Sequence, residues 1–178
     1  MHAEFLAIDD ADWRDADFLL AGDGHASGDL DVQVGISYGS GKKLRVDMRV
    51  VGPNCLFTEA VCCVADIVYV GYAEFIFVIS PEERSVRTHP FEGYFSYIYI
   101  AEDLQTSQHE LAVLVAGASE LLSFSSTGNL LWRSDILAID GVVIDAVKDG
   151  VISGQGEWDP PGGWRPFKLC SKTGEHVT

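Results

Sequence analysis

Residues 115–132 read Val115-Ala116-Gly117-Ala118-Ser119-Glu120-Leu121-Leu122-Ser123-Phe124-Ser125-Ser126-Thr127-Gly128-Asn129-Leu130-Leu131-Trp132. Two turn signals, Gly-x-x-Glu and Ser-x-x-Gly, separate three short apolar runs in this stretch. A glycine at a chain reversal tolerates positive φ without a Cβ clash, so both signals are typical of tight turns between short strands. The stretch therefore predicts an antiparallel β-meander.

Parts of this pattern recur before and after the stretch. The Gly-x-x-Glu turns begin at Gly71, Gly117 and Gly154, and the apolar runs that follow them end at Ser80, Ser125 and Ser171. These serines are 45 and 46 residues apart. A period of about 40–50 residues is typical of four-stranded propeller blades, each of which needs neighbours stacked on its faces. We therefore expect a series of related β-units.

The segment Thr127-Gly128-Asn129-Leu130-Leu131-Trp132-Arg133 and the turn Thr173-Gly174-Glu175 carry a resemblance to a known family. Over about residues 55–178 the chain resembles the quinoprotein-type (PQQ-like) β-propeller repeat, although Ser80-Pro81-Glu82-Glu83 departs from its pattern. The resemblance implies blade-like hairpins. It does not imply a bound quinone, because that cofactor belongs to much longer complete propellers, and we expect no cofactor.

The predicted fold class is all-β, an antiparallel meander of propeller-like repeated hairpins that forms an incomplete or small propeller. We expect one domain over residues 1–178, with an acidic N-terminal arm over 1–29, a hairpin over 30–52 and three blade-like repeats over 53–178. The hairpin is the clearest local signal, because residues 30–39 and 43–51 alternate apolar and polar around Gly39-Ser40-Gly41. Residues 81–93, which include His89, are predicted to be an exposed polar connection.

The net charge is −15, from 27 acidic and 12 basic side chains. Phosphate binding needs a basic footprint, so this charge argues against nucleic acid as a partner and favours a basic protein or simple solubility. Nine carboxylates stand against Arg14 in the first 31 residues, either as a surface for a basic partner or as a solvated face around a docked first strand. The hairpin's basic side chains are expected to pair with this arm: Lys42, Lys43, Arg45 and Arg49.

The N-terminus shows no basic segment followed by an apolar core, and no apolar run approaches the roughly 18 residues that a membrane span needs. The four cysteines include no CxxC pair. We therefore expect a cytoplasmic protein with reduced thiols and no membrane contact.

No arrangement in the sequence supports catalysis, and we predict no catalytic residue and no metal site. The five histidines have no ligand spacing, and neither a Gly-x-Ser-x-Gly turn nor an Asp-x-Asp-x-Asp-Gly loop is present. An acidic rim remains as a candidate, in which Glu74, Glu120 and Glu157 occupy one position of the repeat. Converging carboxylates can bind a hard cation or share a proton, whereas solvated corner carboxylates only protect strand edges.

The third unit carries an unusual loop, Glu157-Trp158-Asp159-Pro160-Pro161-Gly162-Gly163-Trp164-Arg165-Pro166. Trp and Arg dominate the energetics of protein interfaces, and loops on a rigid sheet often carry function. We therefore predict partner binding by Trp158, Asp159, Trp164 and Arg165, with a self-packed loop as the alternative. The aromatic run 94–100 poses the same choice, and there packing in the core is the favoured interpretation.

These observations favour a non-catalytic, acidic protein-binding module with a basic protein as its partner. An immunity-type inhibitor of a basic effector is one concrete form, because charge complementarity speeds and orients association. One alternative is a cation-binding or hydrolytic protein that uses the glutamate rim. The other is a purely structural protein that forms a homo-oligomer through exposed strand edges.

Overall fold

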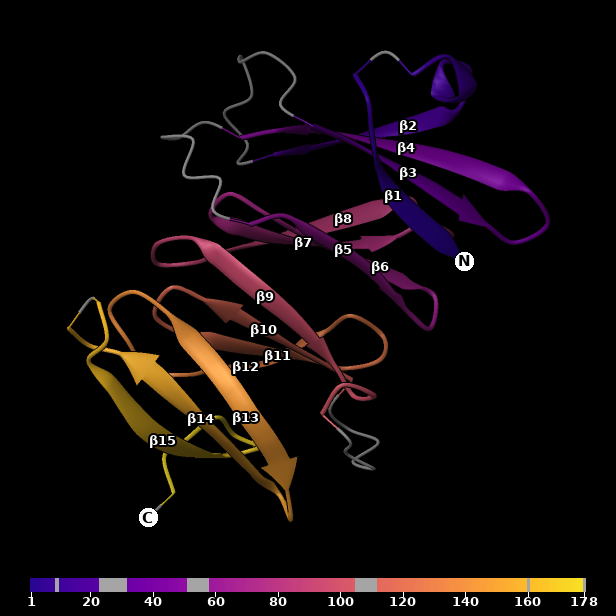
Figure 1. Cartoon of the computed structure of the whole chain (residues 1–178). Coiled ribbons are helices and arrows are strands. Elements are labelled where there is room, and N and C mark those ends of the chain that lie inside the picture. The colour runs from indigo at the N-terminus through magenta and orange to yellow at the C-terminus, as the bar shows by residue number, and fades with distance from the viewer. Residues whose placement is uncertain (9, 23–31, 51–57, 105–111, 160, 178) are drawn as a thin grey trace.

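The described residues form four β-sheets, which stack one on the next in chain order (Figure 1). The computed structural model describes residues 1–8, 10–22, 32–50, 58–104, 112–159 and 161–177. We number the sheets first to fourth from the N-terminus. The predicted all-β fold class, with its propeller-like meander of hairpins, is confirmed.

The first sheet has the strand order β1-β3-β4-β2. Its strands are β1 (His2–Leu6), β2 (Asp17–Gly22), β3 (Val32–Tyr38) and β4 (Lys42–Arg49), and the 3-10 helix η1 (Ala11–Trp13) joins β1 to β2. The predicted hairpin is β3–β4, which turns through Gly39 and Gly41 with positive φ. The acidic arm belongs to the same sheet, because β1 pairs with β3 and β2 runs parallel to β4. Residues 9, 23–31 and 51–52 of the arm and hairpin lie outside the described residues.

The second and third sheets are four-stranded antiparallel meanders. The second contains β5 (Ala60–Val64), β6 (Ile67–Tyr72), β7 (Phe75–Ser80) and β8 (Ser85–Pro90). The third contains β9 (Phe95–Ile100), β10 (Val113–Gly117), β11 (Leu121–Phe124) and β12 (Leu130–Arg133). This shared topology is the structural form of the sequence repeat.

The fourth sheet repeats the meander with β13 (Val142–Lys148), β14 (Val151–Glu157) and β15 (Trp164–Cys170). The C-terminal tail runs where the fourth strand of the preceding sheets lies. Leu169 forms a β-bridge with His176, and the Val177 amide donates to the Lys168 carbonyl at 3.0 Å. The tail therefore completes the unit without forming a full strand.

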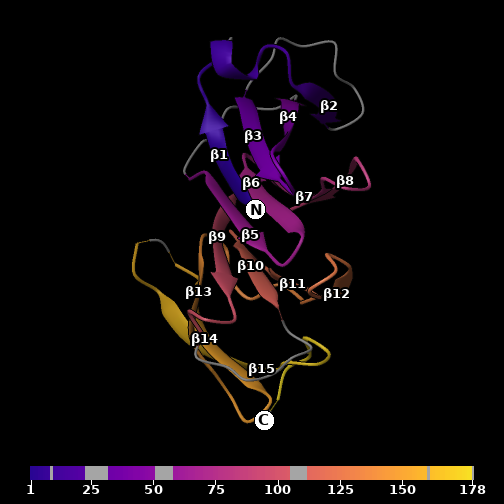
Figure 2. The ribbon, with the colours of Figure 1, turned by 90° about the vertical axis from the view of Figure 1, so that its right-hand side faces the viewer.

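Apolar clusters fill the three spaces between successive sheets, which lie one above another in both views (Figures 1 and 2). Strand β6 shows how one strand serves two of them. Val68 and Val70 join the cluster against the first sheet, while Ile67 and Tyr69 join the cluster against the third. Because alternate side chains point to opposite faces, a strand covered on both faces reads as an unbroken apolar run.

The outer face of the first sheet is covered by η1 instead of by another sheet. A Cβ built on Gly35 of β3 would lie 2.6 Å from the indole of Trp13, so only glycine allows the helix to approach so closely. Beside it, Asp47 accepts hydrogen bonds from Gln33 at 2.9 Å and from Arg45 at 2.8 Å. This polar, capped face ends the stack at its N-terminal side.

The prediction that residues 81–93 form a polar connection is wrong for residues 85–90. They form β8, which pairs with β7 from Phe75↔Pro90 to Ser80↔Ser85. His89 is half-buried, with its ring 5.2 Å from the ring of Phe124. A strand at the edge of a sheet does not need apolar side chains, and those of β8 are mostly polar. Its backbone hydrogen bonds to β7 still hold it in the sheet.

The hairpin's basic side chains meet the arm through its backbone, since Lys43 donates to the Asp12 carbonyl at 3.2 Å and Arg45 to the Trp13 carbonyl at 3.3 Å. The described ion pairs do not join them to the arm's carboxylates. Lys42 pairs with Glu82 of the second sheet at 2.8 Å. Asp17 of the arm pairs instead with Arg84, from the β7–β8 turn, at 2.7 Å. Asp17 reaches Arg84 because β2, at the edge of the first sheet, contacts β8 of the second.

Candidate functional site

Five chain reversals meet along one edge of the stacked sheets, and we call this surface the loop rim. It consists of the β6–β7 turn (73–74), the β8–β9 connection (91–94), the β10–β11 turn (118–119), the β12–β13 connection (134–141) and the described part of the β14–β15 loop (158–159 and 161–163). Backbone hydrogen bonds of 2.7–2.8 Å join them from Phe91 N to Glu74 O, Ala118 N to Tyr94 O, Leu137 N to Ser119 O and Ile139 N to Glu157 O. The loop rim is therefore one connected surface of three sheets.

The three predicted rim glutamates all lie on or beside this surface, but they are not equivalent. Glu74 is the second residue of the β6–β7 turn, because Tyr72 pairs with Phe75. Glu120 follows its turn, since the Gly117 amide donates to the Glu120 carbonyl at 2.9 Å. The prediction that the glutamates occupy one position of the repeat is therefore wrong for Glu74 and Glu120, which differ by one residue relative to their turns.

Two of these carboxylates are used locally. Glu120 is buried and accepts hydrogen bonds from Arg133 and, at 3.1 Å, from the Glu92 amide. Glu157, the last residue of β14, accepts a hydrogen bond from the Gly162 amide at 2.6 Å. Within the part of the chain that the structure describes, no group of three or more His, Cys, Asp or Glu side chains has a metal-binding arrangement.

The loop between β14 and β15 is partly self-packed. The Trp158 amide donates to the Gly163 carbonyl at 3.0 Å, and the Arg165 guanidinium lies 5.6 Å from the centroid of the Trp158 ring. Trp158 is half-buried by these contacts, whereas Asp159 is exposed and Trp164 is 41% exposed. Of the two tryptophans, Trp164 is thus the one available to a partner. Pro160 lies outside the described residues.

The structure adds two aliphatic side chains that sequence reasoning missed. Ile136 and Ile139, in the β12–β13 connection, are 56% and 59% exposed. The Ile139 amide bonds to the Glu157 carbonyl, and Glu157 pairs directly with Trp164 across β14–β15. Ile139 and Trp164 therefore lie on either side of Glu157.

Tyr94 connects two parts of the loop rim. Its hydroxyl lies 2.9 Å from the Asp140 carbonyl and 3.1 Å from an Asp140 carboxylate oxygen. Burial, followed by the hydrogen bond and the charge of Asp140, raises the pKa of Tyr94 to about 12. The phenol therefore remains protonated and holds the β8–β9 connection against the β12–β13 connection.

Carboxylates outnumber basic groups on this surface. The exposed carboxylates of the loop rim are Glu92, Asp135, Asp140 and Asp159. The basic groups beside them are Arg165 and Arg133, and Arg133 is already bound to Glu120 and to the Pro90 carbonyl. Exposed apolar side chains surrounded by unpaired negative charge suit contact with a basic protein surface.

Comparison with known proteins identifies no relative: no family model, no curated protein and no solved structure matches this chain. No helix within the described residues is long and apolar enough to cross a membrane.

Proposed function

We propose that the protein is a non-catalytic binding module whose loop rim grips a basic protein. The observation that carries this proposal is that Ile139 and Trp164, two exposed apolar side chains, lie on either side of Glu157, with the carboxylates of Asp140 and Asp159 in the adjoining loops. A large aromatic side chain can anchor an interface, and the surrounding carboxylates orient a partner of opposite charge.

Inhibition of a basic effector, as an immunity protein does, is the specific form of this proposal. The net charge of −15 supports it, because such inhibitors neutralise a basic surface and associate quickly. We further propose that the protein works in the cytoplasm and that its sheets are an incomplete set of PQQ-like propeller blades. The repeated Ser-x-x-Gly turns at Ser125 and Ser171 support the family assignment.

Affinity capture with the tagged protein tests the function. We expect a basic partner that is retained at low salt and released at about 0.5 M salt, where screening shortens the range of surface charges. Trp164→Ala should weaken the purified complex by about 30-fold or more, because truncating an interface anchor costs about 2 kcal/mol or more.

Leu20→Ser is the matched control. Leu20 is 54% exposed but lies on β2 of the first sheet, away from the loop rim. Its replacement should leave the affinity unchanged. If the complex keeps full affinity with both Trp164→Ala and Asp140→Asn, the loop rim is not the binding surface. If no partner is captured at low salt, the proposed function is wrong.

The glutamate-rim alternative has less support in the structure. Glu120 is neutralised by Arg133, so a cation placed there would have to displace an existing ion pair. Calorimetry with divalent ions on the protein and on Glu74→Gln, Glu120→Gln and Glu157→Gln decides between the two functions. Heat that disappears in these variants would favour the cation-binding protein.

A further inference from the structure

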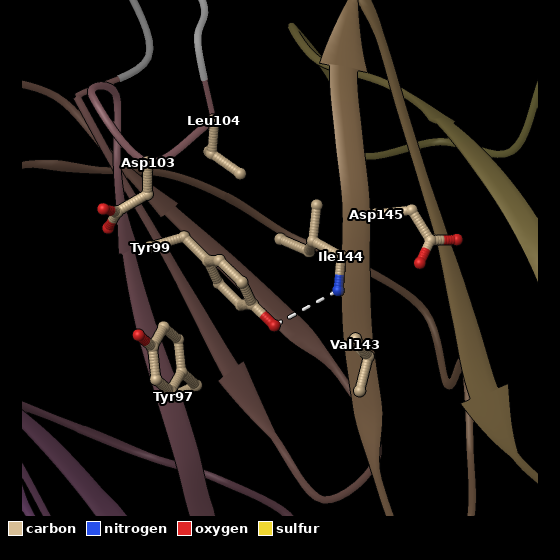
Figure 3. Close-up of a pocket in the computed structure, with 7 residues that line it drawn as sticks. All are labelled: Tyr97, Tyr99, Asp103, Leu104, Val143, Ile144 and Asp145. Carbon is tan, nitrogen blue, oxygen red and sulfur yellow. Dashed lines mark hydrogen bonds between the residues drawn. The ribbon is translucent and has the colours of Figure 1, made fainter.

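The strands β9 and β13 are edge strands of the third and fourth sheets, and a groove of about 390 Å³ lies between them (Figure 3). Its walls include Tyr97 and Tyr99 from β9, and Val143 and Asp145 from β13. Asp103, just after β9, also lines it. The groove begins next to the loop rim, since Val143 follows Asp140 by three residues.

Two tyrosines on β9 form an aromatic wall of this groove. Tyr97 and Tyr99 are two residues apart and share one face of the strand, with ring centroids 4.7 Å apart and ring planes at 57°. The Tyr99 hydroxyl accepts a hydrogen bond from the Ile144 amide of β13 at 3.2 Å, which fixes this ring across the groove (Figure 3). Tyr97 is not so covered and remains 53% exposed.

Asp145 owes its position to an irregularity in β13. The ladder with β14 pairs Ile144 with Gly154 and Ala146 with Ser153, so Asp145 has no residue opposite it. A β-bulge of this kind redirects a side chain, and bulges are frequent beside functional sites. Burial, opposed by the bond from Ile144 and assisted by the nearby Tyr97 and Asp145, raises the pKa of Tyr99. The Tyr99 ring thus stays neutral beside the carboxylate.

We propose that this groove binds one lysine or arginine side chain of the basic partner, an assignment that rests on the proposed function. The faces of tyrosine rings attract cations, and the carboxylates of Asp103 and Asp145, one on each side of the groove and turned outward from the Tyr99 ring (Figure 3), make its surroundings negative. The groove has no basic side chain among its lining residues. The loop rim supplies the apolar anchor, and the groove beside it selects the cationic side chain.

Titration followed by backbone amide NMR tests the groove without the partner. The probes are blocked arginine and blocked lysine, with blocked glutamine as a neutral control of similar size. We expect saturable shifts confined to amides of β9 and β13, including Ile144, with both cations but not with glutamine. Shifts spread over the whole acidic surface, or equal shifts with glutamine, would overturn the proposal.

Variants make the test specific. Tyr97→Ala should weaken binding of the cationic probes by about threefold or more, the effect expected of losing a cation–π contact. Asp145→Asn should also weaken it, whereas Asp12→Asn removes the same charge from η1, far from the groove and the loop rim, and should not. Equal weakening by Asp145→Asn and Asp12→Asn would show that only net charge matters and would overturn the proposal.

The groove and the proposed function can fail separately. If Trp164→Ala breaks the complex with the captured partner but Tyr97→Ala does not, the loop rim remains the interface and the groove assignment is wrong. If the groove binds the cationic probes and no basic partner is captured, the groove remains and the proposed function is wrong.

Discussion

The indole Nε1 of Trp132 donates a hydrogen bond of 2.9 Å to the backbone carbonyl of Ser171 and so joins the third sheet to the fourth. One repeat earlier, the Tyr69 hydroxyl lies 3.1 Å from the carbonyl of Ser125 and joins the second sheet to the third. Both carbonyls open a Ser-x-x-Gly turn, so the repeated turn serves as an acceptor for the preceding sheet. Contact between neighbours, rather than any one sheet, holds the stack together.

Trp132→Phe should therefore destabilise the protein by about 2 kcal/mol or more, because the Ser171 carbonyl loses the hydrogen bond from the indole and the core loses volume. The urea midpoint of unfolding measures this change. Trp164→Phe is the control, since Trp164 is exposed, and its effect should stay within about 0.5 kcal/mol. Equal destabilisation by the two changes would contradict the role given to Trp132.

The Glu120–Arg133 pair predicts a second contrast. Glu120→Gln should cost about 1–3 kcal/mol, since Glu120 is buried and its bond with Arg133 is charge-assisted. Glu82→Gln, which breaks the exposed pair with Lys42, should cost less than about 1 kcal/mol. Chemical denaturation of both variants gives the comparison, and a larger loss for Glu82→Gln would refute it.

His89 should make stability depend on pH. Burial, followed by the positive charges of Arg133 and Arg87, lowers the pKa of His89 in the folded state. The unfolded chain then takes up the proton at a higher pH than the folded one, so the folding stability from His89 is complete above about pH 6.5 and falls as the pH drops below that value.

Urea midpoints of the wild type and His89→Gln, measured at about pH 7.5 and about pH 5.5, check this prediction. The wild type should lose more stability between the two conditions than the variant does. Comparison with the variant removes the contribution of the carboxylates, which is common to both proteins. The same loss in both would mean that His89 does not titrate as described.

The described cysteines should differ in reactivity. Burial, then the neighbouring Cys63 and Asp103, raises the pKa of Cys62 to about 12, whereas hydrogen bonds from the Lys172 amide and from Thr173 lower the pKa of Cys170. Because the thiolate is the nucleophile, iodoacetamide at about pH 8 should modify Cys170 at least about tenfold faster than Cys62. Peptide mapping measures both rates, and unfolding in urea should bring them together.

Much of the fold follows from local sequence signals. The strand predicted over 75–80 is β7, and the hairpin around Gly39 and Gly41 is β3–β4, because turn glycines and apolar periodicity act within a few residues. β8 was missed because its polar side chains carry no strand pattern. The one-residue offset between Glu74 and Glu120 was missed because Gly-x-x-Glu spacing does not state which two residues form the turn.

The candidate site was only partly visible in the sequence. Trp164 was found because its residue type and its Pro-Gly loop are unusual, but the sequence could not separate it from Trp158. Their difference arises from the loop's own hydrogen bonds and from Arg165 on the Trp158 ring. Ile139 carried no signal of its own, since its position beside β14 depends on a backbone bond to Glu157.

The sequence by itself determined the all-β class, the repeating turns and the acidic charge, since these depend on residue type and short-range spacing. The tertiary structure decided which sheets meet and that the arm joins the first sheet. It also decided that the Tyr99 hydroxyl of the third sheet bonds to the Ile144 amide of the fourth. Such relationships depend on register and on the stacking of units far apart in the chain. A shift of one residue in pairing would turn every side chain to the other face, and local spacing does not determine that choice.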